Sequence, residues 1–215
     1  MIQHHTSQDL LLDYAAGGLD EASSILVASH IALCPACRST VAEAENLGGA
    51  LLESGEPEAM SISSLAKVLD RIGMQADESS VPKADAGANT ALTQPLRGYV
   101  SDQLARGGWR WIAPGLRQVV LTTSKAATAR LFRLSPGTRV PVHSHQGQEL
   151  TLVLTGSYRD ECGVFARGDV ANLDDSVTHQ PVVSRDGECL ALAVTRAPLR
   201  FRNAAIRLIQ PLLGI

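Results

Sequence analysis

Apolar residues recur with the period of an α-helix through the first third of the chain. A helix commonly begins after a side chain whose oxygen can cap it, and Ser7, Asp20 and Ser61 stand at such positions. Pro35 suits the first turn of a further helix, because the N–H that it lacks would have no partner there. We therefore expect four helices, at residues 7–18, 20–33, 35–53 and 61–73.

The last of these helices carries an apolar stripe formed by Ile62, Leu65, Leu69 and Ile72. A bundle of a few short helices has a small core and is only marginally stable by itself. The stripe is therefore needed either to complete that core or to bind a partner. The pattern of residues is compatible with both uses.

Beyond residue 95 the period changes to that of β-strands. Short runs rich in Val, Leu and Thr are separated by Gly, Pro or Asp, which is typical of an antiparallel β-sandwich or barrel. These runs lie at residues 117–124, 128–135, 149–160, 163–173 and 188–196. Residues 75–95 are rich in Ala, Ser, Asp and Pro without any period, which predicts a linker between the two patterns.

The predicted fold class is therefore multidomain, with a helical N-terminal domain and an all-β C-terminal domain. The predicted division is a helical domain at 1–74, a linker at 75–95, a β domain at 96–200 and a tail at 201–215. The tail is apolar with two arginines, and we expect it to form a short closing helix.

Composition and charge narrow the function classes. The chain has 215 residues, of which 45% are hydrophobic and 19% charged, as in ordinary globular proteins. A net charge of −3 and a pI near 6.1 exclude the basic surface of a protein that binds nucleic acid directly. No apolar run reaches the roughly 18 residues that cross a membrane, and the N-terminus lacks the pattern of a signal peptide. We expect no membrane association and a cytoplasmic location, where thiols stay reduced.

Cysteine and histidine gather at the end of the second predicted helix. His30, Cys34 and Cys37 have the spacing H-x3-C-x2-C, which supplies three of the four tetrahedral ligands of a structural zinc site. The fourth ligand is expected from the histidine pair before the first helix, with His5 preferred and His4 as the alternative. The competing interpretation is a redox pair, which would be expected in a βαβ setting that this part of the chain does not predict.

Residues 4–38, which carry these motifs, resemble the zinc-binding domain of anti-sigma factors. The histidine pair ahead of a short first helix is similar to the ChrR-type family. The resemblance implies that the zinc ligands are His5, His30, Cys34 and Cys37. It also implies that the four helices bind an extracytoplasmic-function (group IV) sigma factor, for which we expect a 1:1 complex. Such a complex would cover the surfaces that the sigma factor offers to RNA polymerase and to the promoter.

A second group of metal-ligand residues lies in the predicted β domain. His143 and His145 are two residues apart, so their side chains point to the same face of a strand. Glu149 follows after a short turn with a glycine, and His179 is the one histidine left to complete the set. Three imidazoles and a carboxylate suit Zn, Fe, Mn, Ni or Cu. We expect these four side chains to hold a divalent transition metal.

Residues 137–156 have the form G-x5-H-x-H-x3-E-x6-G and resemble the first motif of the cupin family. The second cupin motif is matched in part, because Gly168 and His179 stand at the required separation. Three other positions of that motif are occupied by Asp174, Ser176 and Val183 in place of Pro, Gly and Asn. The resemblance covers roughly residues 96–197 and implies a double-stranded β-helix with the metal inside.

The order of a zinc anti-sigma domain followed by a cupin is that of ChrR-type proteins. The resemblance implies a regulator and not an enzyme, in which the cupin receives a signal that weakens the grip on the sigma factor. A small molecule or an oxidant such as singlet oxygen is the signal that it suggests. The alternatives are a metal-dependent cupin enzyme of the dioxygenase type and a zinc-bound adaptor for another helical partner. Cys162 and Cys189 are expected either as buried core residues or as thiols that respond to oxidants.

Overall fold

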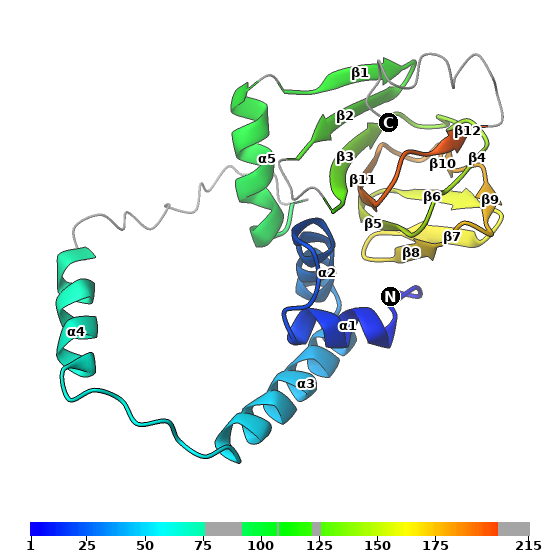
Figure 1. Cartoon of the computed structure of the whole chain (residues 1–215). Helices are drawn as coiled ribbons and strands as arrows, with labels where there is room; N and C mark the ends of the chain where they lie inside the picture. Colours follow the sequence, from blue (N-terminus) through cyan, green and yellow to red (C-terminus); the bar gives the residue numbers. More distant parts are fainter. Residues whose placement is uncertain (76–91, 107, 122–125, 202–215) are drawn as a thin grey trace.

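The computed structural model describes residues 1–75, 92–106, 108–121 and 126–201. Helices occupy the N-terminal part of the chain, and antiparallel sheets occupy the C-terminal part (Figure 1). This arrangement confirms the predicted fold class. Most of the predicted linker and all but the first residue of the predicted tail lie outside the described residues, including the helix expected in the tail. We call residues 1–75 the helical half and residues 110–201 the β half.

The first three helices begin where the sequence predicts. Ser7 accepts a hydrogen bond from the Leu10 N–H, and Asp20 accepts one from the Ser23 N–H, so both expected caps are confirmed. The fourth helix begins three residues later than its expected cap, because Ser61 lies in a turn that precedes it. The helices of this half are α1 (Gln8–Ala15), α2 (Glu21–Leu33), α3 (Pro35–Glu53) and α4 (Ser64–Gln75).

A fifth helix, α5 (Gln94–Arg106), was not predicted. It begins in the segment expected to be the end of the linker, and Pro95 stands in its first turn. Leu96 and Val100 lie one helical turn apart and are fully or almost fully buried. Contacts with α2 and with strand β2 (Leu116–Val120) therefore stabilise this helix, and such contacts are not visible in a local pattern of residues.

The β half consists of one large antiparallel sheet and two small ones. The large sheet has six strands in the order β1-β2-β3-β11-β5-β8, and the small sheets have the orders β10-β6-β7 and β12-β4-β9. The strands are β1 (Arg110–Ala113), β2 (Leu116–Val120), β3 (Thr128–Leu134), β4 (His143–Ser144), β5 (Glu149–Thr155), β6 (Ser157–Asp160), β7 (Gly163–Ala166), β8 (Val170–Leu173), β9 (Thr178–His179), β10 (Val182–Val183), β11 (Cys189–Thr195) and β12 (Arg200–Phe201).

The two halves share one hydrophobic core. Helix α2 packs on the large sheet, where it contacts β3, β5 and β11 (Figure 1). Leu26 of α2 is fully buried in the same cluster as Leu152 of β5 and Leu192 of β11. The opposite face of the sheet forms a second core with the small sheets, so β5 and β11 are buried on both faces. This explains why the sequences of these two strands are almost continuously apolar.

Helix α4 stands apart from the rest of the molecule (Figure 1). Its apolar stripe is open to solvent, with Leu65 at 69% and Leu69 at 57% exposure. The sequence was compatible with two uses of this stripe, packing into the core of the helical half or binding a partner. The stripe does not pack into that core in the structure, because it is exposed. The predicted stripe residues Leu65, Leu69 and Ile72 lie on α4 and Ile62 lies in the turn before it, and all four are exposed, as is the neighbouring Val68.

No single helix in the described ranges is long and apolar enough to cross a membrane. Helices α2 and α3 reach the necessary length and apolar composition only together, and they are bent against each other by 117°.

Candidate metal centres

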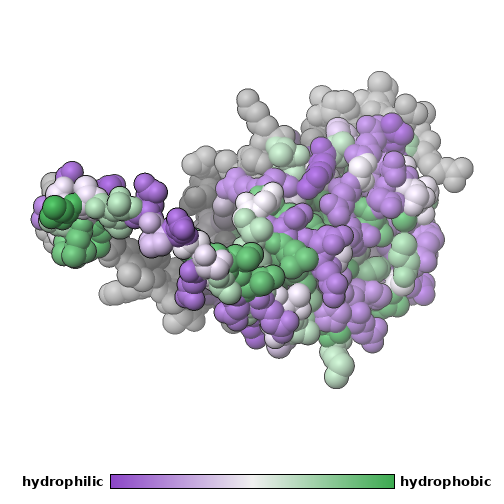
Figure 2. All heavy atoms as spheres, turned by 60° about the horizontal axis from the view of Figure 1, so that its bottom comes forward, coloured by the Kyte–Doolittle hydropathy of each residue, from purple (hydrophilic) through white to green (hydrophobic). Residues whose placement is uncertain are grey.

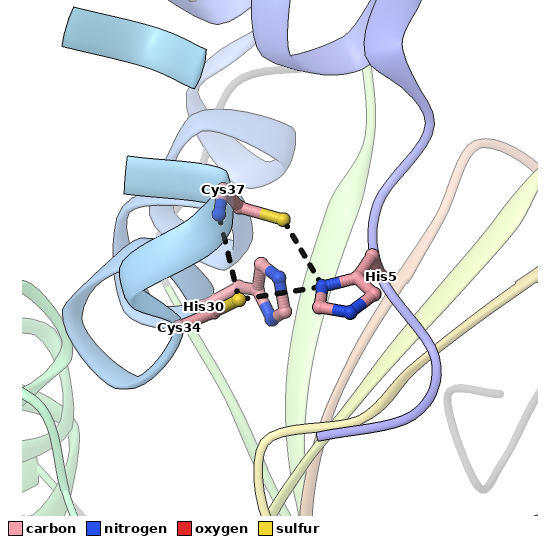
Figure 3. A group of neighbouring side chains, drawn as sticks. All are labelled: His5, His30, Cys34 and Cys37. Atoms are coloured by element: carbon pink, nitrogen blue, oxygen red, sulfur yellow. Dashed lines mark hydrogen bonds between the residues drawn. The ribbon is translucent and has the colours of Figure 1, made fainter. Parts of the chain in front are cut away.

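Four side chains meet where the N-terminal arm (residues 1–6) crosses the corner between α2 and α3 (Figure 3). The His5 Nδ1 atom lies 3.3 Å from the Cys34 Sγ atom and 3.3 Å from the Cys37 Sγ atom. The His30 ring stands edge-on to the His5 ring, with centroids 6.2 Å apart. One ligand atom from each of the four side chains lies within 4.8 Å of all the others. We call this group the Cys/His cluster.

The corner between the helices results from the Cys34-Pro35 pair. Proline disfavours the helical conformation of the residue before it, and Cys34 is extended, with φ −109° and ψ 102°. Cys34 therefore ends α2 and caps α3, and its Sγ atom accepts a hydrogen bond from the Cys37 N–H at 3.5 Å. The corner turns His30, in the last turn of α2, toward the thiols of Cys34, at the corner itself, and of Cys37, in α3.

The chemistry of the Cys/His cluster fits a zinc ion. The His30 Nδ1–H donates to the Gly168 carbonyl oxygen at 2.9 Å, so Nε2 carries the lone pair that faces the thiols. This Nε2 atom is buried and has no hydrogen-bond partner among the described residues. Burial lowers the pKa of His30, which favours the neutral imidazole that binds metals. Burial and the neighbouring Cys34 raise the pKa of the Cys37 thiol to about 11, and a bound cation would reverse that preference.

His4 does not belong to the cluster. Its Nε2 atom lies 3.2 Å from the Val164 carbonyl oxygen, and its ring packs on Phe165 with centroids 4.5 Å apart. Of the two histidines considered for the fourth position, the structure brings His5 to the thiols and turns His4 to the β half.

A second group, the His/Glu cluster, lies inside the β half. The His179 Nε2 atom is 3.1 Å from the His143 Nε2 atom and 3.2 Å from the His145 Nε2 atom. The Glu149 Oε2 atom lies 3.1 Å from the His145 Nδ1 atom. All four side chains are buried, and their ligand atoms lie within 4.8 Å of one another. The structure thus brings together all four residues that the sequence singled out.

Strand pairing and hydrogen bonds orient the imidazoles. His143 of β4 lies directly opposite His179 of β9, so both rings point into the same space. The His143 Nδ1–H donates to the Pro141 carbonyl oxygen, and the His179 Nδ1–H donates to the Asp160 Oδ2 atom, each at 2.8 Å. The lone pairs of the two Nε2 atoms therefore face each other and would repel without a cation between them. This arrangement fits a metal ion.

The ionisation states suit the same interpretation. Burial lowers the pKa of His143 to about 4, so its ring is neutral near pH 7. Burial raises the pKa of Glu149, but the adjacent His145 and the two other imidazoles lower it below its usual value. Asp160 likewise stays ionised, since hydrogen bonds from His179 and from the backbone outweigh the effect of burial on its pKa. The cluster therefore combines the neutral imidazole of His143 with the ionised carboxylate of Glu149.

Sequence reasoning missed two residues that support the His/Glu cluster. Thr151 donates its hydroxyl proton to the Glu149 Oε1 atom at 3.0 Å. Its position two residues after Glu149 on the same strand was a usable signal, because alternate residues share a face. Asp160, which orients His179, lies 19 residues before it, and no spacing rule indicates this pair.

A cavity of about 200 Å³ adjoins the His/Glu cluster. Its walls are mainly apolar, and His143, Glu149 and His179 form part of them. Cys189 also lines the cavity and is fully buried, and burial raises the pKa of its thiol to about 12. Cys162 is exposed, so the expectation of a buried core residue is wrong there. The Cys162 N–H donates a hydrogen bond to the Asp160 Oδ1 atom in the turn between β6 and β7, and this turn places Cys162 at the surface.

Comparison with known proteins finds a matching family for each half of the chain. Residues 100–198 match the family described as the ChrR cupin-like domain, and residues 5–38 match a zinc-finger family. The full chain is 41% identical over 214 residues to the anti-sigma-E factor ChrR of Cereibacter sphaeroides and covers 99% of that protein. The chain belongs to the ChrR family of anti-sigma factors.

The fold agrees with a solved member of the ChrR family. The structure is similar to the ChrR chain in the crystal structure of Rhodobacter sphaeroides SigE in complex with the anti-sigma factor ChrR. The TM-score is 0.77 at 39% identity, over 91% of this chain and 99% of that chain. The predicted resemblance is confirmed, and so is the expectation of a regulator in place of an enzyme, because the full-length relative is an anti-sigma factor.

Proposed function

We propose that this chain binds an extracytoplasmic-function sigma factor in a 1:1 complex in the cytoplasm and keeps it from RNA polymerase. In this proposal the helical half folds around a zinc ion held by His5, His30, Cys34 and Cys37. The β half holds a second divalent metal through His143, His145, Glu149 and His179, and a signal received there releases the sigma factor. The observation that carries the proposal is full-length similarity to an anti-sigma-E factor in a chain that has both ligand clusters.

The exposed faces of α3 and α4 support the helical half as the binding surface. The C-terminal part of α3 exposes Leu47, Leu51 and Leu52, the last of them at 82%. Figure 2 shows apolar atoms gathered on α4, which projects at the left of the view. Large apolar side chains on two separated helices are unusual on a monomer and are typical of a surface that a partner covers. We call the exposed apolar residues of α3 and α4 the clasp surface.

The proposed signal acts at the β half. The cavity beside the His/Glu cluster is lined by apolar groups, imidazoles and the Cys189 thiol. A small apolar molecule fits such walls. The buried Cys189 thiol stays protonated, because burial raises its pKa, and it is therefore a poor target for oxidants that react with a thiolate. Singlet oxygen is the oxidant that the family resemblance suggests.

Strand β8 supports communication between the two clusters. In its pairing with β5, Leu173 lies opposite Glu149. The residue before β8 is Asp169, which binds the N-terminal arm next to His5. One short strand therefore connects Glu149 with the N-terminal arm, and we expect a displacement of Glu149 to shift the arm through this strand.

Binding can be tested by transcription with purified components. Core RNA polymerase and an extracytoplasmic-function sigma factor from the source organism should transcribe a target promoter. One equivalent of the full chain should suppress this activity, and the two proteins should elute together at 1:1 stoichiometry. Unchanged transcription with every such sigma factor of that organism would contradict the proposed function.

The two clusters predict two metal ions per chain. Elemental analysis of the purified protein should find zinc in the Cys/His cluster and a divalent transition metal in the His/Glu cluster. The double variant His143→Ala, Glu149→Ala should retain one ion, which should be zinc, because it leaves all four ligands of the Cys/His cluster in place. A parent protein with one ion or none would refute the two-site proposal.

A fragment of residues 1–85 should still inhibit the sigma factor, because it contains the clasp surface and the Cys/His cluster. It should be less stable than the full chain, since removal of the β half uncovers Ala22, Ile25 and Leu26 of α2. Thermal unfolding would show the loss of stability, and the transcription assay would show the retained inhibition. Inhibition by the full chain alone would show that the proposed domain division is wrong.

A further inference from the structure

The turn between β7 and β8 contacts the helical half at the Cys/His cluster. Gly168, in this turn, accepts the hydrogen bond from the His30 Nδ1–H at 2.9 Å, across 138 positions of the sequence. His30 is fully buried, so water does not offer its ring an alternative acceptor. The contact sets which ring nitrogen carries the proton and thereby directs Nε2 to the thiols.

The next residue of the turn holds the arm that carries His5. Asp169 is 3% exposed, and its Oδ1 atom accepts hydrogen bonds from the Gln3 N–H at 2.7 Å and the His4 N–H at 2.9 Å. Its Oδ2 atom accepts from the Ala166 N–H at 2.8 Å, which fixes the carboxylate within the turn. The Val170 N–H donates to the His4 carbonyl oxygen at 3.0 Å. The arm is therefore bound on both sides of the His4 backbone, immediately before His5.

Close packing of Ile2 completes the contact. Gly168 has φ +94°, and a Cβ atom on it would come within 2.6 Å of the Ile2 Cδ1 atom. Glycine is thus required both by the backbone conformation of the turn and by the approach of the arm. The turn contacts two ligands of the Cys/His cluster, His30 directly and His5 through the arm.

We propose that the β7–β8 turn is the outer shell of the Cys/His cluster, so that the β half sets the metal affinity of a site whose ligands all belong to the helical half. Gly168 and Asp169 are positioning residues in this proposal, and they do not contact the metal. Outer-shell partners of metal-bound histidines typically contribute about 10–100-fold in metal affinity. Ordinary packing between the two halves would stabilise the fold but would leave the geometry of the metal site unchanged. The proposal depends on metal binding by the Cys/His cluster, which is part of the proposed function.

Cobalt(II) is a suitable probe, because thiolate ligands give it a charge-transfer absorption. Among the two clusters, only the Cys/His cluster contains cysteine, so this absorption reports on that site within the full-length protein. In Asp169→Asn the amide nitrogen would either face the Ala166 N–H or displace the arm, so the three hydrogen bonds cannot all form. Asp186→Asn is the matched control, since Asp186 is exposed and its side chain binds Ser184 within its own loop.

Titration of the metal-free full chain should show that Asp169→Asn raises the dissociation constant for Co²⁺ by about 10-fold or more. The cobalt absorption spectrum at saturation should also shift, because the orientation of His5 relative to the metal changes. The control should match the parent in both respects. An affinity within twofold of the parent together with an unshifted spectrum would overturn the inference.

A second variant covers the case in which Asp169→Asn does not fold. Ile2→Ala leaves every hydrogen bond of the turn in place and removes the packing of this side chain on Gly168 and on the apolar cluster around Cys34 and Cys37. It should weaken Co²⁺ binding several-fold, and an unchanged affinity would refute the role of the turn. A parent chain without the thiolate absorption would instead refute metal binding by the Cys/His cluster, so the two failures are distinguishable.

Discussion

Replacement of Cys34 by serine should abolish zinc binding in the helical half and, with it, inhibition of the sigma factor. Cys34 is 2% exposed and belongs both to the Cys/His cluster and to the cap of α3. Structural zinc sites contribute about 10–16 kcal/mol of binding energy to folding, and a hydroxyl is a poor substitute for a thiolate ligand. Loss of one zinc ion per chain, reduced helical circular dichroism and restored transcription are the expected measurements.

Cys162→Ser is the control for this variant, because Cys162 is an exposed free cysteine outside both clusters. It should retain both metals and full inhibition. Cys34→Ser with unchanged helicity and undiminished sigma binding would mean that the metal in the helical half is not structural.

The double variant Leu65→Ser, Leu69→Ser should lose sigma binding without loss of stability. Both side chains are more than half exposed in the free protein, so the fold does not depend on their burial. Burial of one leucine at an interface contributes about 1.5–3 kcal/mol, and two such losses correspond to about 100-fold or more in the dissociation constant. Binding by titration calorimetry and unfolding by heat would measure the two effects separately.

Trp111→Gln provides the comparison, since Trp111 is an apolar side chain with 63% exposure on β1, away from the clasp surface. It should bind the sigma factor like the parent. Equal binding by Leu65→Ser, Leu69→Ser and by Trp111→Gln would show that the stripe of α4 is not part of the interface.

The elements that sequence predicted well are those with local causes. Ser7 and Asp20 cap their helices through side-chain oxygens, and Pro35 ends one helix and starts the next. The His143 and His145 pair was found because a strand has a period of two. In each case the residues that determine the structure lie within a few positions of one another.

The features that sequence did not predict depend on contacts between distant segments. Helix α5 is held by Leu96 and Val100 against the shared core, and only the packed structure reveals that contact. The bond from His30 to Gly168 joins residues 138 positions apart, in segments that the sequence assigned to separate domains. Asp160 of β6 meets His179 of β9 between two different small sheets, and no local spacing specifies this contact.

The core that α2 shares with the large sheet also limits how such proteins can diversify. Leu26 fills a space shaped by Leu152 and Leu192, so a β half taken from an unrelated protein would present α2 with different side chains. Recombination at the segment between the halves would exchange one side of this packed surface and leave the other unmatched. Helices and sheets are therefore expected to be inherited together, and new signal specificities to arise by substitutions inside the cavity and not by replacement of the whole β half.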